Sequence, residues 1–276
     1  MISKKRKWIK ILLLVIVIAA AAAAKPLYDG YKEYRQNAVP VLEYHSVGGS
    51  DDWPAEVIIK TEAFEKQLQY LHDNGYRMLS MEQMIYGFKN GEDMGKSVVL
   101  TFDDGYIDNY VNVFPLLQKY NANASFFIVQ SKIGKPNYMG HNEIMNLIRA
   151  GNDLGSHTIN HNILTDIDPK YFAWELSSSK FFLKKEFDMY YVHLLSYPNG
   201  EYDDEVIAAA IKYGYNYAVT GKNGAVDKNW IEQHPMEIGR VIIKGDMTES
   251  EFASKLERSY LLGYLKSVVF GSLFFY

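Results

Sequence analysis

The chain has 276 residues, of which 48% are hydrophobic, enough to bury a full core in one large domain or in two. Its formal charge is −4 at pH 7, which argues against nucleic-acid binding. It contains no cysteine, so disulfides and thiol chemistry are excluded. Aromatic residues make up 14% of the chain, a content that suits carbohydrate contact and ordinary packing alike.

The first 24 residues are typical of a segment that meets a membrane. A basic head precedes an apolar run from Ile11 to Ala24, shorter than the roughly 20 residues that cross a bilayer comfortably. The alanines at its end are typical of a secretory signal peptide over residues 1–24. Trp8 and Ile9 instead extend the run toward an uncleaved anchor, which would attach the chain to a membrane through residues 8–24. Either alternative places the domain outside the cytoplasm, secreted or anchored to the outer face of the cell membrane.

After a polar, tyrosine-rich linker over residues 25–37, segments typical of strands alternate with segments typical of helices. Capping boxes at Ser80–Gln83 and Thr248–Glu251 mark two helix starts, and Asp168 followed by Pro169 predicts the start of a long helix. The predicted strands are 39–44, 97–102, 124–129, 153–156, 192–197, 216–220 and 237–243. The predicted helices are 61–74, one from 81, one across 113–120, 142–150, one from 169, 203–213 and one from 249.

This alternation predicts a parallel sheet, and about seven or eight such units in one domain predict an α/β barrel. In such barrels functional side chains gather at the carboxyl ends of the strands. The polar residues that directly follow predicted strands are His45, Asp103, Asp104, His157 and Asn199. The pattern therefore predicts that these residues converge.

The chemistry of two stretches supports a cation site. Asp103 and Asp104 follow a buried strand, where they suit either a turn that caps the next helix or a bound cation. His157 and His161 are four residues apart and would face the same way in a helix. One carboxylate and two imidazoles make a three-ligand site that leaves room for water, as a catalytic metal requires.

The two stretches together resemble the first two motifs of the polysaccharide deacetylase family, the NodB-homology domain of carbohydrate esterase family 4. They read Thr-Phe-Asp-Asp-Gly at 101–105 and Ser-His-Thr-Ile-Asn-His at 156–161. The segment 39–47, Val-Pro-Val-Leu-Glu-Tyr-His-Ser-Val, resembles the branch that includes poly-N-acetylglucosamine deacetylases. The resemblance covers roughly residues 38–258, which we take as the deacetylase domain, and it implies a distorted barrel, usually of seven strands.

The resemblance also implies roles for individual residues. Asp104, His157 and His161 would bind a divalent metal, zinc in the first instance, with other divalent transition metals as alternatives. Asp103 would be the catalytic base, and the backbone N–H of Asn199 would stabilise the oxyanion. His45 would lie at the mouth of the site, as one candidate for the group that returns a proton to the departing amine.

The third motif departs from the family pattern. It reads Ser-Tyr-Pro-Asn-Gly at 196–200, where Ser196 replaces an arginine that positions the base in many members. The poly-N-acetylglucosamine branch tends to lack this arginine too, so what orients Asp103 stays open. Arg240 is a candidate charge partner for Asp103, and Tyr197, Pro198 and Arg240 are candidate substrate-binding residues.

The later motifs are weak. The family's closing histidine has no clear match. His193 and His234 are candidates by residue type, and surface or packing roles suit both. Residues 227–230 match either a site-lining segment or a surface loop. The apolar extension 259–276 suits a strand or helix packed on the barrel, with membrane contact as the alternative.

The sequence therefore predicts a monomeric, metal-dependent enzyme that removes acetyl groups from N-acetylglucosamine units of an extracellular or cell-wall polysaccharide. Alternatives are a deacetylase of peptidoglycan, chitin oligomers or acetylated xylan, and a glycan-binding barrel without catalysis. The intact Asp and His motifs argue against the last, because a binding module has no need of a base and metal ligands together.

Overall fold

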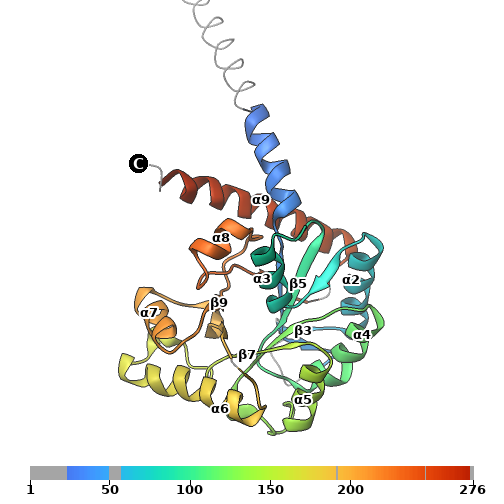
Figure 1. The fold of residues 1–276 in the computed structure, drawn as a ribbon. Coiled ribbons are helices and arrows are strands. Elements are labelled where there is room, and N and C mark those ends of the chain that lie inside the picture. Colours follow the sequence, from blue (N-terminus) through green and yellow to red (C-terminus); the bar gives the residue numbers. More distant parts are fainter. Residues whose placement is uncertain (1–23, 50–56, 191, 246, 274–276) are drawn as a thin grey trace, which may run out of the picture.

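Strand β5 (Ser97–Phe102) lies inside a sheet in which every strand pair is parallel. The computed structural model describes residues 24–49, 57–190, 192–245 and 247–273, and the leader expected at 1–24 lies outside them except for its last residue. The sheet has eight strands in the order β10-β1-β5-β6-β7-β8-β9, with β4 paired to β5 (Figure 1). The other strands are β1 Val41–Tyr44, β4 Arg77–Leu79, β6 Ser125–Ile128, β7 Asp153–Ser156, β8 Leu194–Ser196, β9 Tyr217–Val219 and β10 Val241–Ile242.

The segment that ends in β10 joins the two edges of this sheet. Ile238 forms a parallel bridge to Val219 of β9, and three residues later β10 pairs with β1. The sheet is thereby curled into a distorted barrel, which confirms the predicted α/β class. The strand predicted over 237–243 is shorter than expected, because its first half makes only the single bridge to β9. A separate two-stranded sheet pairs β2 (Ser46–Val47) with β3 (Ile58–Ile59).

Helices cover the outside of the barrel, and most begin where the sequence predicts. Ser80 and Gln83 form the expected capping box, and Asp203 accepts a hydrogen bond from the Val206 N–H at the start of another helix. The α-helices are α2 Thr61–Asp73, α3 Met81–Asn90, α4 Phe114–Lys119, α5 His141–Arg149, α6 Ser179–Glu186, α7 Asp204–Lys212, α8 Lys228–Gln233 and α9 Glu249–Leu273. A π-helical turn over Asn109–Val113 precedes α4.

The long helix predicted after Asp168 is broken into pieces. Asp168 does cap a helical start, because its side chain accepts from the Lys170 N–H, but this is a short 3-10 helix, Pro169–Tyr171. A π-helix, Ala173–Ser178, follows and leads into α6. The extra residue in a π turn changes which side chains face inward, and such turns are frequent at functional sites.

Alternation along the strands separates apolar from polar positions. On β5, Val98, Leu100 and Phe102 point outward to a core shared with the helices, whereas Val99 packs in a second cluster inside the barrel. The next residues on the inward side are Thr101 and Asp103, so polar groups begin where the carboxyl end of the strand is reached. The alternation of side chains along β5 thus directs Asp103, the first of the two adjacent aspartates, into the barrel.

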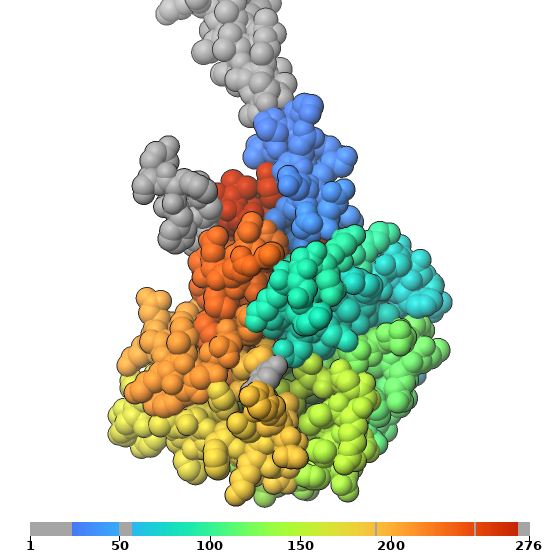
Figure 2. All heavy atoms as spheres, viewed as in Figure 1, coloured from blue at the N-terminus to red at the C-terminus, as the bar shows by residue number. Residues whose placement is uncertain are grey.

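Two helices extend from the barrel on one side, as Figure 2 also shows. Residues 24–37 form a helix, so the linker predicted over 25–37 is helical. The apolar extension predicted over 259–276 continues α9 through residue 273. Tyr264 of α9 lies between Tyr31 and Tyr34, with ring centroids 5.9 Å away in both cases. Within the described ranges, no helix combines the length and the apolar character needed to cross a membrane.

A half-buried carboxylate, that of Asp153, links α3 to the sheet. Asp153 Oδ2 accepts from the Glu82 N–H at 2.9 Å and from Ser125 Oγ at 2.8 Å. Ser125 Oγ in turn accepts from the Met81 N–H. Burial raises the pKa of Asp153 to about 6, although these donors oppose the shift. A carboxyl group whose pKa is raised by folding stabilises the fold below its ordinary pKa, and this contribution is lost as pH rises through the folded value.

We therefore expect the wild-type chain to lose stability relative to Asp153→Asn as pH rises, because the asparagine stays neutral. The loss should be on the order of 2 kcal/mol between about pH 4 and about pH 7. Urea unfolding of both proteins across this range measures it. Parallel stability curves would show that Asp153 does not titrate in this window.

Candidate active site

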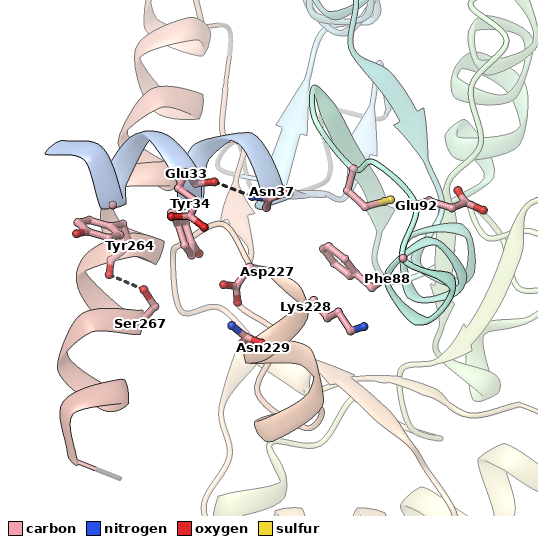
Figure 3. Close-up of a pocket in the computed structure, with 13 residues that line it drawn as sticks. Glu33, Tyr34, Asn37, Phe88, Glu92, Asp227, Lys228, Asn229, Tyr264 and Ser267 are labelled. Carbon is pink, nitrogen blue, oxygen red and sulfur yellow. Dashed lines mark hydrogen bonds between the residues drawn. The ribbon is translucent and has the colours of Figure 1, made fainter. Parts of the chain in front are cut away.

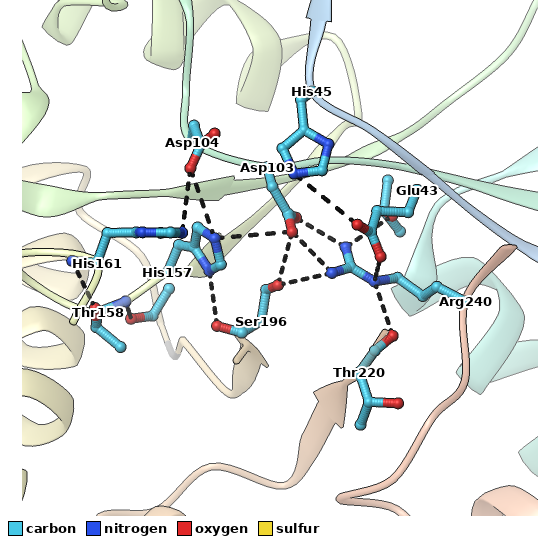
Figure 4. A network of polar contacts seen from close by, with 12 residues as sticks. Glu43, His45, Asp103, Asp104, His157, Thr158, His161, Ser196, Thr220 and Arg240 are labelled. Atoms are coloured by element: carbon cyan, nitrogen blue, oxygen red, sulfur yellow. Dashed lines mark hydrogen bonds and ion pairs between the residues drawn. The ribbon is translucent and has the colours of Figure 1, made fainter. Parts of the chain in front are cut away.

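A pocket of about 270 Å³ opens at the carboxyl ends of the strands. It collects all five polar residues that the sequence places after strands, together with several that it did not single out. Its lining consists of Glu43, His45, Val57, Asp103, Asp104, His157, His161, Asn199, Gly200, Gly221, Arg240, Ile242 and Lys244. Figure 4 shows Asp103 in the middle of this set, with His157 and His161 on one side and Arg240 on the other.

Asp103 forms a buried, two-pronged ion pair with Arg240. Nη1 and Nη2 of Arg240 each donate to one carboxylate oxygen at 2.8 Å, and the side chains are 1% and 2% exposed. Burial alone would raise the pKa of the Asp103 carboxyl, but the Arg240 guanidinium and, less strongly, His157 hold that pKa well below its usual range. Asp103 is therefore ionised at any pH near neutrality.

Ser196 completes the contacts that orient Asp103. Its Oγ donates to Asp103 Oδ2 at 3.0 Å and accepts from Arg240 Nη2 at 3.1 Å. The serine and Arg240 together orient the carboxylate in a chain that lacks the arginine of the third motif. The remaining donors of Arg240 also point at the chain's own acceptors, Thr101 Oγ1 and the Thr220 carbonyl. The structure thus places Arg240 as an ion-pair partner of Asp103, with its donors engaged by the protein. Arg240 also lines the pocket, and its contact with substrate stays a prediction.

Asp104, His157 and His161 form a second group beside this pair. Asp104 Oδ1 lies 3.7 Å from His157 Nε2 and 3.6 Å from His161 Nε2, and the three candidate ligand atoms lie within 4.8 Å of one another. His157 Nδ1 contacts the Ser196 carbonyl at 2.8 Å. Because a carbonyl can only accept, Nδ1 carries the proton and Nε2 keeps its lone pair free. Burial lowers the pKa of His157, which also favours the neutral ring that a metal binds.

The two histidines meet in a loop and not, as the four-residue spacing suggested, on a helix. Thr158 and His161 have φ values of 64° and 60°, which no helix contains, and the two rings are 4.6 Å apart. Asp104 also has a positive φ of 73°, which turns it away from the direction of β5 and toward this loop. Left-handed backbone at Asp104, Thr158 and His161 therefore brings the three side chains of the group together, and backbone strain of this kind is concentrated at functional sites.

A buried glutamate that sequence reasoning missed holds the loop in shape. Glu175, on the π-helix, is 1% exposed and accepts from the backbone N–H groups of Ile159 and Asn160 at 3.0 Å each. The side-chain amides of Asn160 and Asn162 donate to its other oxygen at 2.9 and 2.8 Å. Ser179, one turn on, bonds to Ser156 Oγ and to the Thr158 carbonyl. Hydrogen bonds from the π-helix and from the first residue of α6 thus fix the conformation of the histidine loop.

His45 lies on the opposite side of the pocket, next to a second residue that was missed. Its Nε2 is 3.9 Å from Oε1 of Glu43, and the other oxygen of Glu43 lies 3.1 Å from Arg240 Nε. Burial raises the pKa of Glu43, against the effect of Arg240. Glu43, His45 and Asp103 have their polar atoms close enough to hold a metal, but both carboxylates already pair with the Arg240 guanidinium. This second group therefore fits a cation poorly.

The turn 197–200 contributes its backbone to the pocket. Asn199 is left-handed, with φ 57° and ψ 10°, and both it and Gly200 line the pocket. A Cβ on Gly200 would come within 2.2 Å of the Gly221 nitrogen, so only glycine allows the two loops to approach. Tyr197 and Pro198, predicted to bind substrate, are buried and absent from the pocket lining, and Tyr197 stacks on Tyr202 with centroids 5.2 Å apart.

The remaining candidates lie away from this pocket. His193 forms an ion pair with Glu82, and His234 stacks on Trp230 with centroids 4.2 Å apart. Asp227 caps α8 by accepting from the Trp230 N–H. It lines a larger hollow of about 470 Å³ between α8, α9 and the helix over 24–37 (Figure 3). This hollow lacks the converging histidines and carboxylates of the other pocket, so we place the chemistry at the carboxyl ends of the strands.

Known proteins resemble the chain in sequence and in fold. The family model described as polysaccharide deacetylase matches residues 90–218. YxkH of Bacillus subtilis, which carries the name of that family, is 31% identical over 220 residues, covering 79% of this chain and 76% of its own. The poly-beta-1,6-N-acetyl-D-glucosamine N-deacetylase of Staphylococcus aureus is 24% identical over 243 residues, covering 79% and 82%.

A solved structure agrees with these matches. The Streptococcus pyogenes deacetylase PplD, in complex with acetate, superposes with a TM-score of 0.71 at 27% sequence identity. The superposition covers 81% of this chain and 98% of that one. The similarity in fold therefore extends over most of the chain.

Replacement of Glu175 tests its effect on the histidine loop. Glu175→Gln would present an amide donor where the loop also presents donors, so we expect a loss of about 1–3 kcal/mol in unfolding free energy. The exposed Glu205 on α7 offers a matched control, Glu205→Gln, with an expected change within about 0.5 kcal/mol. Urea unfolding measures both, and amide hydrogen exchange at Ile159 and Asn160 should accelerate only in the first variant. Equal stability of the two variants would contradict the role of Glu175.

Proposed function

This chain belongs to the polysaccharide deacetylase family, and we propose that it removes acetyl groups from N-acetylglucosamine units of a polysaccharide outside the cytoplasm. As a member of this family it is a hydrolase that acts on carbon–nitrogen bonds. The observation that carries the proposal is the meeting of Asp104, His157 and His161 in one pocket, with the ionised Asp103 beside them.

Two observations support a poly-N-acetylglucosamine substrate. The Staphylococcus aureus relative is named for a poly-N-acetylglucosamine substrate, and the segment over 39–47 resembles that branch. The basic and apolar leader supports a place outside the cytoplasm, either secreted or on the outer membrane face. Peptidoglycan, chitin oligomers and acetylated xylan are the competing substrates, and acetate release from each polymer in parallel separates them.

The residues present fit a divalent metal such as zinc. Asp104, His157 and His161 would hold it, since they offer one carboxylate oxygen and two imidazole nitrogens, with Nε2 of His157 left unprotonated by the Ser196 contact. Such a metal supplies Lewis acidity, which lowers the pKa of water and polarises the acetyl carbonyl. The contact of His157 with a backbone carbonyl is the kind of outer contact that fixes a metal-binding ring.

Asp103 accepts the proton of the attacking water in this proposal. Its ion pair with Arg240 keeps it ionised, so it is always available as an acceptor, but it also makes it a weak base. Asp103 therefore serves best as a fixed acceptor for water that is already acidified. Ser196 and Arg240 prevent its rotation and hold one oxygen 3.8 Å from His157 Nε2.

The other side of the pocket handles the oxyanion and the departing amine. The Asn199 N–H is the proposed donor to the oxyanion, and a backbone donor does not depend on the side chain at that position. His45 is the proposed proton donor to the amine nitrogen, with Glu43 placed to orient its ring. The scissile bond breaks as that nitrogen takes the proton, and acetate and a cationic glucosamine unit leave.

Two variants separate the base from the metal ligands. We expect Asp103→Asn to lower acetate release by about two to four orders of magnitude while bound metal persists, because it removes the proton acceptor but none of the three proposed metal ligands. His161→Ala should lose metal and activity together. Acetate assays and elemental analysis of the full chain measure both, with and without a chelator. Full activity in chelator, or unchanged metal content in His161→Ala, would refute the metal assignment.

The role of His45 is tested by the choice of leaving group. An N-acetyl substrate needs a proton on the departing amine, whereas 4-nitrophenyl acetate releases a stable anion that needs none. We expect His45→Ala to lower hydrolysis of the N-acetylated polymer by about two to four orders of magnitude and to spare the ester. Asp103→Asn, as control, should impair both substrates. Equal losses on both substrates in His45→Ala would exclude it as the proton donor.

A further inference from the structure

The outward face of α9 changes character halfway along the helix. Its inward face is mostly apolar and packs on the barrel through Phe252, Leu256 and Tyr260. The exposed stripe, at spacings of three and four residues, runs through Ser250, Ser254, Glu257, Leu261, Leu265 and Val268. The stripe is therefore polar up to Glu257 and apolar beyond it.

The apolar half is well exposed. Leu261, Leu265, Val268 and Val269 are 46%, 49%, 41% and 56% exposed. A solvent-facing helix ordinarily carries polar residues on this face, as the first half of α9 does. Contiguous exposed apolar surface marks a site of contact with protein or membrane.

The helix over residues 24–37 brings further apolar groups to the same end of α9. Arg35 pairs with Glu257 and lies over Tyr260, whereas Gly30 approaches Tyr264, where an added Cβ would be 2.7 Å from the hydroxyl. The two helices thus cross with opposite directions, and positions before Gly30 lie toward the apolar half of α9. Leu27 and Tyr28 are there, 53% and 59% exposed. Figure 1 shows both helices leaving the barrel at this end.

We propose that this apolar face, formed by Leu27, Tyr28, Leu261, Leu265, Val268 and Val269, rests on the surface of a phospholipid bilayer. The sequence that adjoins the face at both ends is suited to lipid. The basic and apolar run of residues 4–24 leads directly into the helix over 24–37, and residues 268–276 read Val-Val-Phe-Gly-Ser-Leu-Phe-Phe-Tyr. Lys32 lies over the Tyr28 ring, with Nζ 5.4 Å from its centroid, and lysine next to tyrosine is typical of the membrane interface.

The position of the face is compatible with catalysis. The bridge between Val39 and Val226 lies at the amino end of β1, and Ala225 packs with Tyr34 and Tyr260 there. The catalytic pocket opens at the carboxyl ends of the same strands. A bilayer in contact with the face would leave the pocket open. This inference depends on neither the metal nor the substrate.

The absence of cysteine from the sequence provides a direct test, because one introduced cysteine labels one position. Leu265→Cys and Ser254→Cys are matched, since eleven residues separate them and they share one face of α9, about 16 Å apart. Each full-length variant is labelled with the fluorophore NBD and reconstituted with phosphatidylcholine and phosphatidylglycerol vesicles that carry spin-labelled lipid. Near-ultraviolet circular dichroism verifies the fold, and Leu261→Cys serves as a second position in the apolar half.

We expect emission from position 265 to shift to the blue and to be quenched several-fold by the spin-labelled lipid, while position 254 stays in a water-like environment. Position 261 should behave like 265. Absence of quenching at 261 and 265, or equal quenching at 254, would overturn the proposal. A shift at 265 that depends on protein concentration and occurs without vesicles would identify a second copy of the chain as the occupant and would equally overturn it.

Discussion

The ion pair between Asp103 and Arg240 is the interaction on which the site depends. Both side chains are buried, so each charge would be costly alone, and removal of one partner from such a pair typically costs about 3–5 kcal/mol. The pair is tolerated because every neighbouring polar group contributes: Ser196, Thr101 and Glu43 all contact the guanidinium. These residues come from β8, β5 and β1, and Arg240 directly precedes β10. The same contact that orients the catalytic carboxylate thus joins the strands where the barrel closes.

This arrangement gives two adjacent aspartates different chemistry. Asp103 continues the inward side of β5 and is neutralised by Arg240, so it has little charge left to offer a metal. Asp104 has a positive φ, lies at the pocket surface and faces two histidines. Gly105, with φ 81°, continues the turn, and a Cβ there would meet Ile128 at 2.9 Å. The sequence Asp-Asp-Gly therefore encodes one strand end and one sharp turn, and the division of roles follows from that geometry.

The sequence was sufficient to predict those parts of the site that depend on short stretches of the chain. Strand ends and helix caps each depend on a few consecutive residues. The barrel could therefore be predicted, and so could the convergence of His45, Asp103, Asp104, His157 and Asn199. Glu43 left a signal that was not used: a charge on the inward side of an otherwise apolar strand, two residues before His45. Glu175 left none, because in sequence it belongs to an amphipathic helix and only the π turn directs it inward. The loop geometry of His157 and His161 was also hidden, since left-handed residues such as Thr158 have no strong sequence signature.

The catalytic pocket and the proposed membrane-binding face lie at opposite ends of the barrel. The pocket lies at the carboxyl ends of the strands and the apolar face of α9 at their amino ends. The six residues of β5 alone span about 20 Å, and the loops at either end add to that distance. An enzyme held at a bilayer through the amino end would thus present its pocket well beyond the lipid headgroups. Such a placement selects for acetylated units on a polymer that extends away from the membrane and against groups linked directly to lipid, so attachment would itself restrict which glycans the catalytic residues reach.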